Sequence, residues 1–123
     1  MCGHFTQRHL QKKCEWCKAQ SWMQLLHYFP TNESHLIAPT HTDASLLTLA
    51  FPLAIGGLEI SIFGEQPLFL DIEKYCEPNE MIVFGGSKLE SLTKESIYAL
   101  PHRVTSIPGT DRYSAPFKFD CTL

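Results

Sequence analysis

The sequence predicts a single, mainly β domain with a sandwich, barrel or jelly-roll architecture. Its 123 residues suit one hydrophobic core rather than two. From about Trp22 onwards, short apolar or alternating runs are separated by Gly, Pro and Asn, which is the pattern of short strands joined by turns. The sequence shows no helical segments between these runs, which argues against a parallel β/α/β arrangement.

The expected elements follow the chain in order. Residues Thr6 to Gln20 are mostly good helix formers without Gly or Pro, so a short N-terminal helix is predicted there. The segment Pro108-Gly109-Thr110-Asp111 is a strong turn signal between the last two strands, because Pro presets φ and Gly tolerates positive φ. The predicted strands are Met23–Phe29, Ser45–Phe51, Leu58–Phe63, Leu68–Ile72, Met81–Phe84, Ile97–Leu100, His102–Ile107 and Tyr113–Phe119.

The composition excludes several classes of partner. Ten basic and thirteen acidic side chains give a formal net charge of -3, and no segment concentrates Lys and Arg, so nucleic acid and membrane surfaces are not expected partners. No apolar run is long enough to span a membrane, and the first twenty residues lack a secretory apolar region, so a cytoplasmic location is expected. Reduced thiols are expected, because the cysteines are odd in number and unevenly spaced: Cys2, Cys14, Cys17, Cys76 and Cys121.

The strongest chemical signal is a candidate metal site. In His41-Thr42-Asp43 an imidazole and a carboxylate lie two residues apart, and the two-residue period of a strand would place both on one face. His102, near the start of a later predicted strand, is the natural third ligand. Two His and one carboxylate leave coordination positions open, which suits iron(II) chemistry with oxygen better than a closed structural zinc site.

A candidate carboxylate-binding site follows about ten residues after His102. In Arg112-Tyr113-Ser114 the same spacing sends a guanidinium and a hydroxyl to one face of a strand. Arg binds a carboxylate through its planar fork, and Ser adds a hydrogen bond, so a ligand held there could extend its other end towards the metal. Each motif alone is common, but their joint order and spacing is specific.

The segment Cys14-Glu15-Trp16-Cys17, with His4 and His9 upstream, is an alternative candidate for a small zinc site. No second CxxC motif supports it, and two cysteines on a short helix need no metal. A thioredoxin-like disulfide would require a β/α/β setting that this sequence does not provide.

In these motifs the chain resembles the iron(II) and 2-oxoglutarate-dependent oxygenase superfamily, in the branch that includes isopenicillin N synthase and the plant flavonoid oxygenases. The resemblance extends from about Leu25 to Asp120, so the chain is divided into a helical leader of residues 1–24 and an oxygenase domain of residues 25–123. Beyond the ligands, the resemblance includes Leu25-Leu26-His27-Tyr28-Phe29-Pro30, Leu46-Leu47-Thr48-Leu49, Gly56-Gly57-Leu58-Glu59-Ile60, Gly86-Ser87, Leu92-Thr93, His102-Arg103-Val104 and Arg112-Tyr113-Ser114-Ala115-Pro116-Phe117.

The resemblance implies a double-stranded β-helix, which is a jelly-roll barrel, with iron(II) held by His41, Asp43 and His102. It also implies 2-oxoglutarate as co-substrate, with its far carboxylate on Arg112 and Ser114 and a further hydrogen bond from Tyr28. The implied reaction couples oxidative decarboxylation of 2-oxoglutarate with O2 to the oxidation, usually hydroxylation, of a small organic substrate.

The sequence departs from the family in two respects and leaves alternatives open. Family members are usually longer in their N-terminal portion, so a homodimer could cover apolar surface in this shorter chain. His27 stands where many relatives have a polar ligand of the co-substrate, often Asn, and Lys118 stands beside Phe117, where a Phe is commoner. The alternatives are an oxidase of isopenicillin N synthase type, which binds its substrate's carboxylate on the same motif without 2-oxoglutarate, and a non-catalytic jelly-roll binding module.

Overall fold

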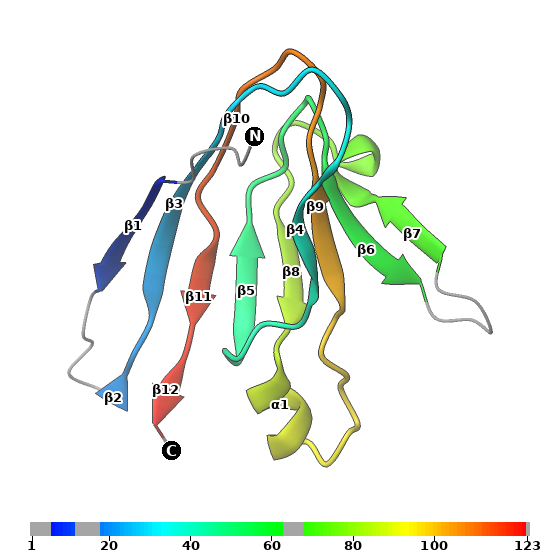
Figure 1. Ribbon diagram of the computed structural model, residues 1–123. Coiled ribbons are helices and arrows are strands. Elements are labelled where there is room, and N and C mark those ends of the chain that lie inside the picture. The colour runs from blue at the N-terminus through cyan, green and yellow to red at the C-terminus, as the bar shows by residue number, and fades with distance from the viewer. Residues whose placement is uncertain (1–5, 12–17, 63–67, 123) are drawn as a thin grey trace.

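The computed structural model describes residues 6–11, 18–62 and 68–122, and the strands in these ranges pair into antiparallel sheets (Figure 1). The predicted mainly β class is confirmed. Within these residues no helix is long and apolar enough to cross a membrane. Contrary to the expectation of no helices between the strands, the described part of the chain contains two short ones, a 3-10 helix η1 (Ile72–Tyr75) and an α-helix α1 (Ser87–Leu92).

The first sheet joins segments from the whole length of the chain. Its strands are β1 (Thr6–Gln11), β3 (Trp22–Tyr28), β11 (Phe117–Phe119), β5 (Leu47–Ala50) and β8 (Ile82–Gly85), in that spatial order, and β10 (Arg112–Ser114) also pairs with β3. The register places Arg112 opposite Tyr28 and Phe117 opposite Met23. Strand β3, near the N-terminus, therefore pairs with two strands from the C-terminal end of the chain, β10 and β11.

The second sheet has the order β4-β9-β6-β7, formed by β4 (Leu36–His41), β9 (His102–Thr105), β6 (Leu58–Ile62) and β7 (Leu68–Asp71). The β4–β9 pairing is irregular, with two register shifts, and it ends with His41 opposite His102. A separate two-stranded sheet pairs β2 (Lys18–Ala19) with β12 (Cys121–Thr122).

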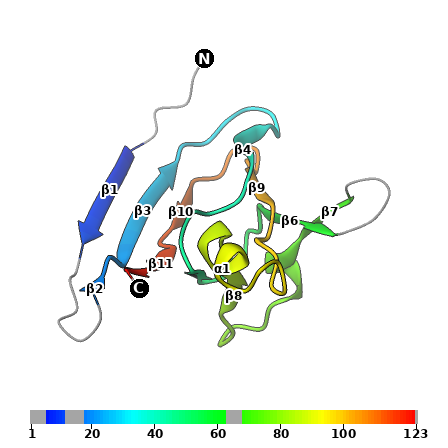
Figure 2. The ribbon, with the colours of Figure 1, turned by 90° about the horizontal axis from the view of Figure 1, so that it is seen from below.

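The two larger sheets enclose a cavity of about 320 Å³. Alternate residues of β3 line it, Trp22, Gln24, Leu26 and Tyr28, because the pleat of a strand sends every second side chain to one face. Figure 2 shows β3 and β11 on one side and β9 and β6 on the other, with α1 at the end nearest the viewer. This two-sheet arrangement agrees with the predicted jelly roll.

The predicted N-terminal helix is wrong. Thr6–Gln11 forms strand β1, which pairs with β3 from Thr6 opposite His27 to Gln11 opposite Trp22, and Lys18–Ala19 forms β2. Helix propensity is a weak preference, and the edge of β3 offers backbone groups that an added strand can pair. The division of the chain after residue 24 stays a prediction.

Other differences concern element boundaries. The predicted strand Tyr113–Phe119 is two strands, β10 and β11, separated at Ala115-Pro116, because Pro lacks the N–H that a continuous ladder needs. Ile97–Leu100 forms no strand and instead connects α1 to β9. Strand β4 is not among the expected strands, and it ends at His41, so Asp43 lies in the following loop and not on the strand face that the spacing predicts.

Candidate metal centre

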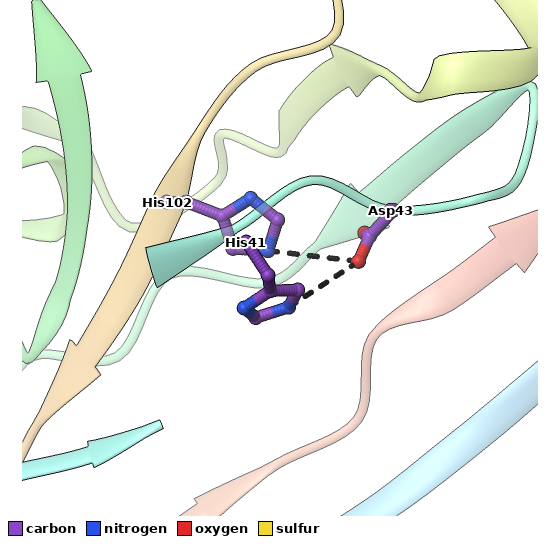
Figure 3. A group of neighbouring side chains, drawn as sticks. All are labelled: His41, Asp43 and His102. Carbon is purple, nitrogen blue, oxygen red and sulfur yellow. Dashed lines mark ion pairs between the residues drawn. The ribbon is translucent and has the colours of Figure 1, made fainter. Parts of the chain in front are cut away.

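Three possible ligands, all of which line the cavity, lie close to one another (Figure 3). His41 ends strand β4, Asp43 lies in the loop that follows, and His102 begins strand β9. The Oδ1 atom of Asp43 lies 3.6 Å from the Nε2 atom of each histidine. One possible ligand atom from each residue lies within 4.8 Å of the other two, so the three can bind a single metal ion.

Backbone carbonyl groups fix the orientation of both imidazoles. Nδ1 of His41 donates to the carbonyl of Pro39 at 2.8 Å, and Nδ1 of His102 donates to the carbonyl of Leu100 at 2.9 Å. A carbonyl only accepts, so Nδ1 carries the proton in both residues. In the neutral form of each imidazole, Nε2 is then unprotonated and faces Asp43, and this is the tautomer that a metal ligand requires.

Burial and neighbouring charges prepare these groups for a cation. Burial lowers the pKa of His102, and this effect exceeds the opposite effects of its hydrogen bond to Leu100 and of the Asp43 carboxylate. Burial alone would raise the pKa of Asp43, but Lys118 and the hydrogen bond from Thr48 hold that pKa below its ordinary value. At neutral pH the site therefore presents a neutral His102 and an ionised Asp43.

The loop that carries Asp43 is held against the segment after β8. The backbone N–H of Ser87 donates to the Asp43 carbonyl at 2.7 Å, and the N–H of Gly86 donates to the Leu46 carbonyl at 2.9 Å. A Cβ atom on Gly86 would collide with the carbonyl oxygens of Ser45 and Asp43. The absence of a side chain at Gly86 thus allows this close packing, which gives the Gly86-Ser87 motif a structural role.

Lys118 also belongs to the metal centre, and the sequence analysis did not predict this role for it. This buried residue of β11 donates from Nζ to Oδ2 of Asp43 and, at 3.3 Å, to the hydroxyl of Thr48. Thr48 itself donates to the same Oδ2 atom. Burial lowers the pKa of Lys118, and the adjacent Asp43 carboxylate opposes that effect.

Arg112, Ser114 and Tyr28 line the other end of the cavity, since Arg112 lies opposite Tyr28 at one end of β3, whereas Lys118 lies opposite Trp22 at the other. Arg112 is 3% exposed, whereas Tyr113 between the two motif residues is 61% exposed, so the predicted alternation along this strand is confirmed. The Arg112 guanidinium lies 5.8 Å from the centre of the Tyr28 ring. Burial raises the pKa of Tyr28, which keeps its hydroxyl protonated, and Arg112 only partly offsets this effect.

Glu73 is the second functional candidate that the sequence did not reveal. Nη2 of Arg112 donates to both carboxylate oxygens of Glu73 at 2.9 Å, and Nε donates to the Gly56 carbonyl at 3.3 Å. Glu73 also accepts the backbone N–H groups of Leu53 and Leu58 at 3.1 and 3.0 Å. These hydrogen bonds compensate for the burial of both charges and fix the orientation of Arg112.

Cys14 and Cys17 of the alternative zinc site lie outside the described residues. Cys76 and Cys121, which are described, are free thiols. His27, in the motif next to Tyr28, is not among the residues that line the cavity; it pairs with Asp111 at 2.6 Å and stacks on Tyr113.

Comparisons with known proteins agree with this geometry. The profile of the 2OG-Fe(II) oxygenase superfamily matches residues 20–120. Among curated proteins, the chain is 32% identical over 109 residues to the 2-oxoglutarate-dependent dioxygenase frbA of Dothideomycetidae sp. (strain 11243), a match that covers 81% of this chain and 31% of that protein. The chain thus spans about a third of that relative's length.

Two solved structures show the same fold. A 2OG-Fe(II) oxygenase family protein from Caulobacter crescentus is 30% identical, with a TM-score of 0.72, and a full-length Neurospora crassa protein in complex with alpha-KG is 26% identical, with a TM-score of 0.69. Each match covers 85% of this chain and 34% of the other. By its profile match, its relatives and its fold, the chain belongs to the 2OG-Fe(II) oxygenase superfamily.

Proposed function

We propose that this chain forms the catalytic site of an iron(II)- and 2-oxoglutarate-dependent dioxygenase that oxidises a small organic substrate. The observation that carries the proposal is that one cavity holds both sets of groups this reaction needs. Metal ligands lie at one end, and a buried arginine with a serine hydroxyl lies at the other.

The residues at the metal end suit iron(II). His41, Asp43 and His102 would bind it through two imidazole nitrogens and one carboxylate oxygen, a set that leaves positions open for other ligands. Bound iron(II) would supply the redox chemistry that couples O2 and 2-oxoglutarate decarboxylation to substrate oxidation, usually hydroxylation. The hydrogen bonds from Nδ1 of both histidines to backbone carbonyls hold the imidazoles ready for this ligation.

The residues at the other end suit the far carboxylate of 2-oxoglutarate. Because Nε and Nη2 of Arg112 are engaged by Gly56 and Glu73, a carboxylate would accept from Nη1 and from the Ser114 hydroxyl. The Tyr28 hydroxyl, protonated at neutral pH, would donate a further hydrogen bond. A cavity of about 320 Å³ is at the lower end of the range for small-molecule sites.

The proposal extends to the branch of the family, the oligomeric state and the location in the cell. Gly86-Ser87 and Arg112-x-Ser114 support a place in the isopenicillin N synthase-like branch. The exposed apolar side chains Leu25, Phe51 and Tyr113 support a homodimer, which light scattering over a range of concentrations would test. A cytoplasmic location completes the proposal, and fractionation of cells would test it.

A two-step experiment tests the function. First, iron(II) and 2-oxoglutarate are added to the protein without oxygen, and we expect a weak visible charge-transfer band that neither ligand produces alone. Second, oxygen is admitted and succinate is measured. Metal uptake without dependence on 2-oxoglutarate would favour an oxidase of isopenicillin N synthase type, and the absence of both band and metal uptake would favour a binding module.

A further inference from the structure

Lys118 places a buried positive charge against a metal ligand. Its Nζ atom donates to Oδ2 of Asp43, the carboxylate whose other oxygen faces His41 and His102. The Lys118 side chain is 9% exposed and the Asp43 side chain 8%, so solvent screens this contact poorly. A metal ion on Oδ1 would therefore share its only anionic ligand with an ammonium group.

Lys118 is not needed to orient the carboxylate. The Thr48 hydroxyl donates to the same Oδ2 atom, and Thr48 is only 1% exposed, so its position is fixed by packing. A neutral hydroxyl can hold Oδ2 in place without repelling a cation on Oδ1. The distinct contribution of Lys118 is its charge, which attracts electron density from the carboxylate and opposes the approach of a second cation.

The charges lining the cavity cancel in the absence of ligands. Lys118 offsets Asp43 at the metal end, and Glu73 offsets Arg112 at the other end. A divalent metal would bring two further positive charges, and the lining has no other carboxylate to balance them. A ligand with two carboxylates, such as 2-oxoglutarate, would balance both.

We propose that Lys118 competes with the metal for Asp43, so that the chain binds a divalent metal firmly only together with a dianionic chelating ligand. The inference rests on the proposed function, because it takes His41, Asp43 and His102 as the metal ligands. Its consequence is a strong positive coupling between metal and co-substrate binding, to which Lys118 contributes by its charge on Asp43 and not by contact with the metal.

The test measures Mn²⁺ affinity by calorimetry, without turnover, for the wild type and for Lys118→Met, with and without 2-oxoglutarate. Without 2-oxoglutarate, we expect Lys118→Met to bind Mn²⁺ about tenfold or more tightly than the wild type, which is the scale on which outer ligands alter metal affinity. We also expect 2-oxoglutarate to increase the affinity of the wild type more than that of the variant.

Lys88→Met is the matched control. Lys88 is also a partly buried lysine in an ion pair, with Asp120 at 2.7 Å, but it does not line the cavity, so its loss should leave Mn²⁺ affinity unchanged. If the Lys118→Met variant does not fold, the same measurement is made on Lys118→Gln, because this substitution also removes the charge. Damage to the structure would weaken metal binding, so a gain in affinity is specific to the proposed competition.

The outcomes separate the inference from the proposed function. If the wild type binds Mn²⁺ and Lys118→Met binds it equally or more weakly, Lys118 supports the site and the inference is wrong while the function stands. If neither protein binds Mn²⁺, with or without 2-oxoglutarate, the metal site itself is wrong and the proposed function fails with it.

Discussion

The side chains at the two ends of the cavity have separable tasks, which single substitutions can test. His102 is a candidate metal ligand, whereas Arg112 contacts none of the metal ligands and pairs with Glu73. We expect His102→Ala to abolish binding of iron(II). Arg112→Lys should still bind iron(II), because it keeps the charge opposite Glu73 but loses the planar guanidinium.

The affinity of Arg112→Lys for 2-oxoglutarate should fall roughly 10- to 100-fold, since a hydrogen bond between charged groups contributes about 1.5–3 kcal/mol. Anaerobic titration of the charge-transfer band measures both quantities. Equal loss of iron(II) in the two variants would contradict this division of tasks.

Glu73 matters for stability because it is the counterion of a buried arginine. We expect Glu73→Gln to lower the free energy of unfolding by about 3–5 kcal/mol, because it leaves the buried Arg112 charge without a counterion. Denaturant unfolding measures the loss. The matched control is Glu59→Gln, which removes the partner of the more exposed Arg103 and should cost about 1 kcal/mol or less. Similar losses in the two variants would show that Arg112 does not depend on Glu73.

At the level of elements, the loop after β4 and the segment after β8 form one packed unit. A Cβ atom added at Gly86 would push against the Asp43 and Ser45 carbonyl groups, so we expect Gly86→Ala to displace Asp43 and weaken Mn²⁺ binding at least tenfold. Gly109→Ala is the control: Gly109 has a φ of +68° but nothing within 4 Å of an added Cβ. It should cost about 1 kcal/mol of stability and leave metal affinity unchanged.

The expected elements agree with the structure where a strand is short, apolar and bounded by turn residues. Strands β3, β5, β6, β7, β8 and β9 fall within about two residues of their predicted bounds. The prediction is wrong for Thr6–Gln11, whose state depends on the edge of β3 rather than on its own composition. Helix propensity amounts to a few tenths of a kcal/mol per residue, and pairing with a neighbouring strand exceeds it.

For the whole molecule, the metal ligands connect the two larger sheets. His41 and His102 belong to the second sheet, while Asp43 lies in the loop that leads to β5 of the first and is held by Lys118 of β11. Ligands that bind only the folded chain should therefore stabilise all of it. Mn²⁺ and 2-oxoglutarate together, at about 100 times their apparent Kd, should raise the free energy of unfolding by about 2.7 kcal/mol.

Thermal unfolding measures this stabilisation, and removal of the metal with a chelator should reverse it. The control is His102→Ala, which should show no shift in Tm with either ligand. A shift that persists in His102→Ala would place the bound metal elsewhere in the chain.

The sequence by itself determined the β class, most strand positions and the spacing that brings His41 and Asp43 together, because these depend on residues close to one another in the chain. It also indicated that Arg112 and Ser114 share a face of a strand. Only the tertiary structure decided that Glu73 neutralises Arg112 and that Lys118 contacts Asp43, since these partners lie 39 and 75 residues apart. Local patterns carry no information on which distant charges meet when two sheets close over one cavity.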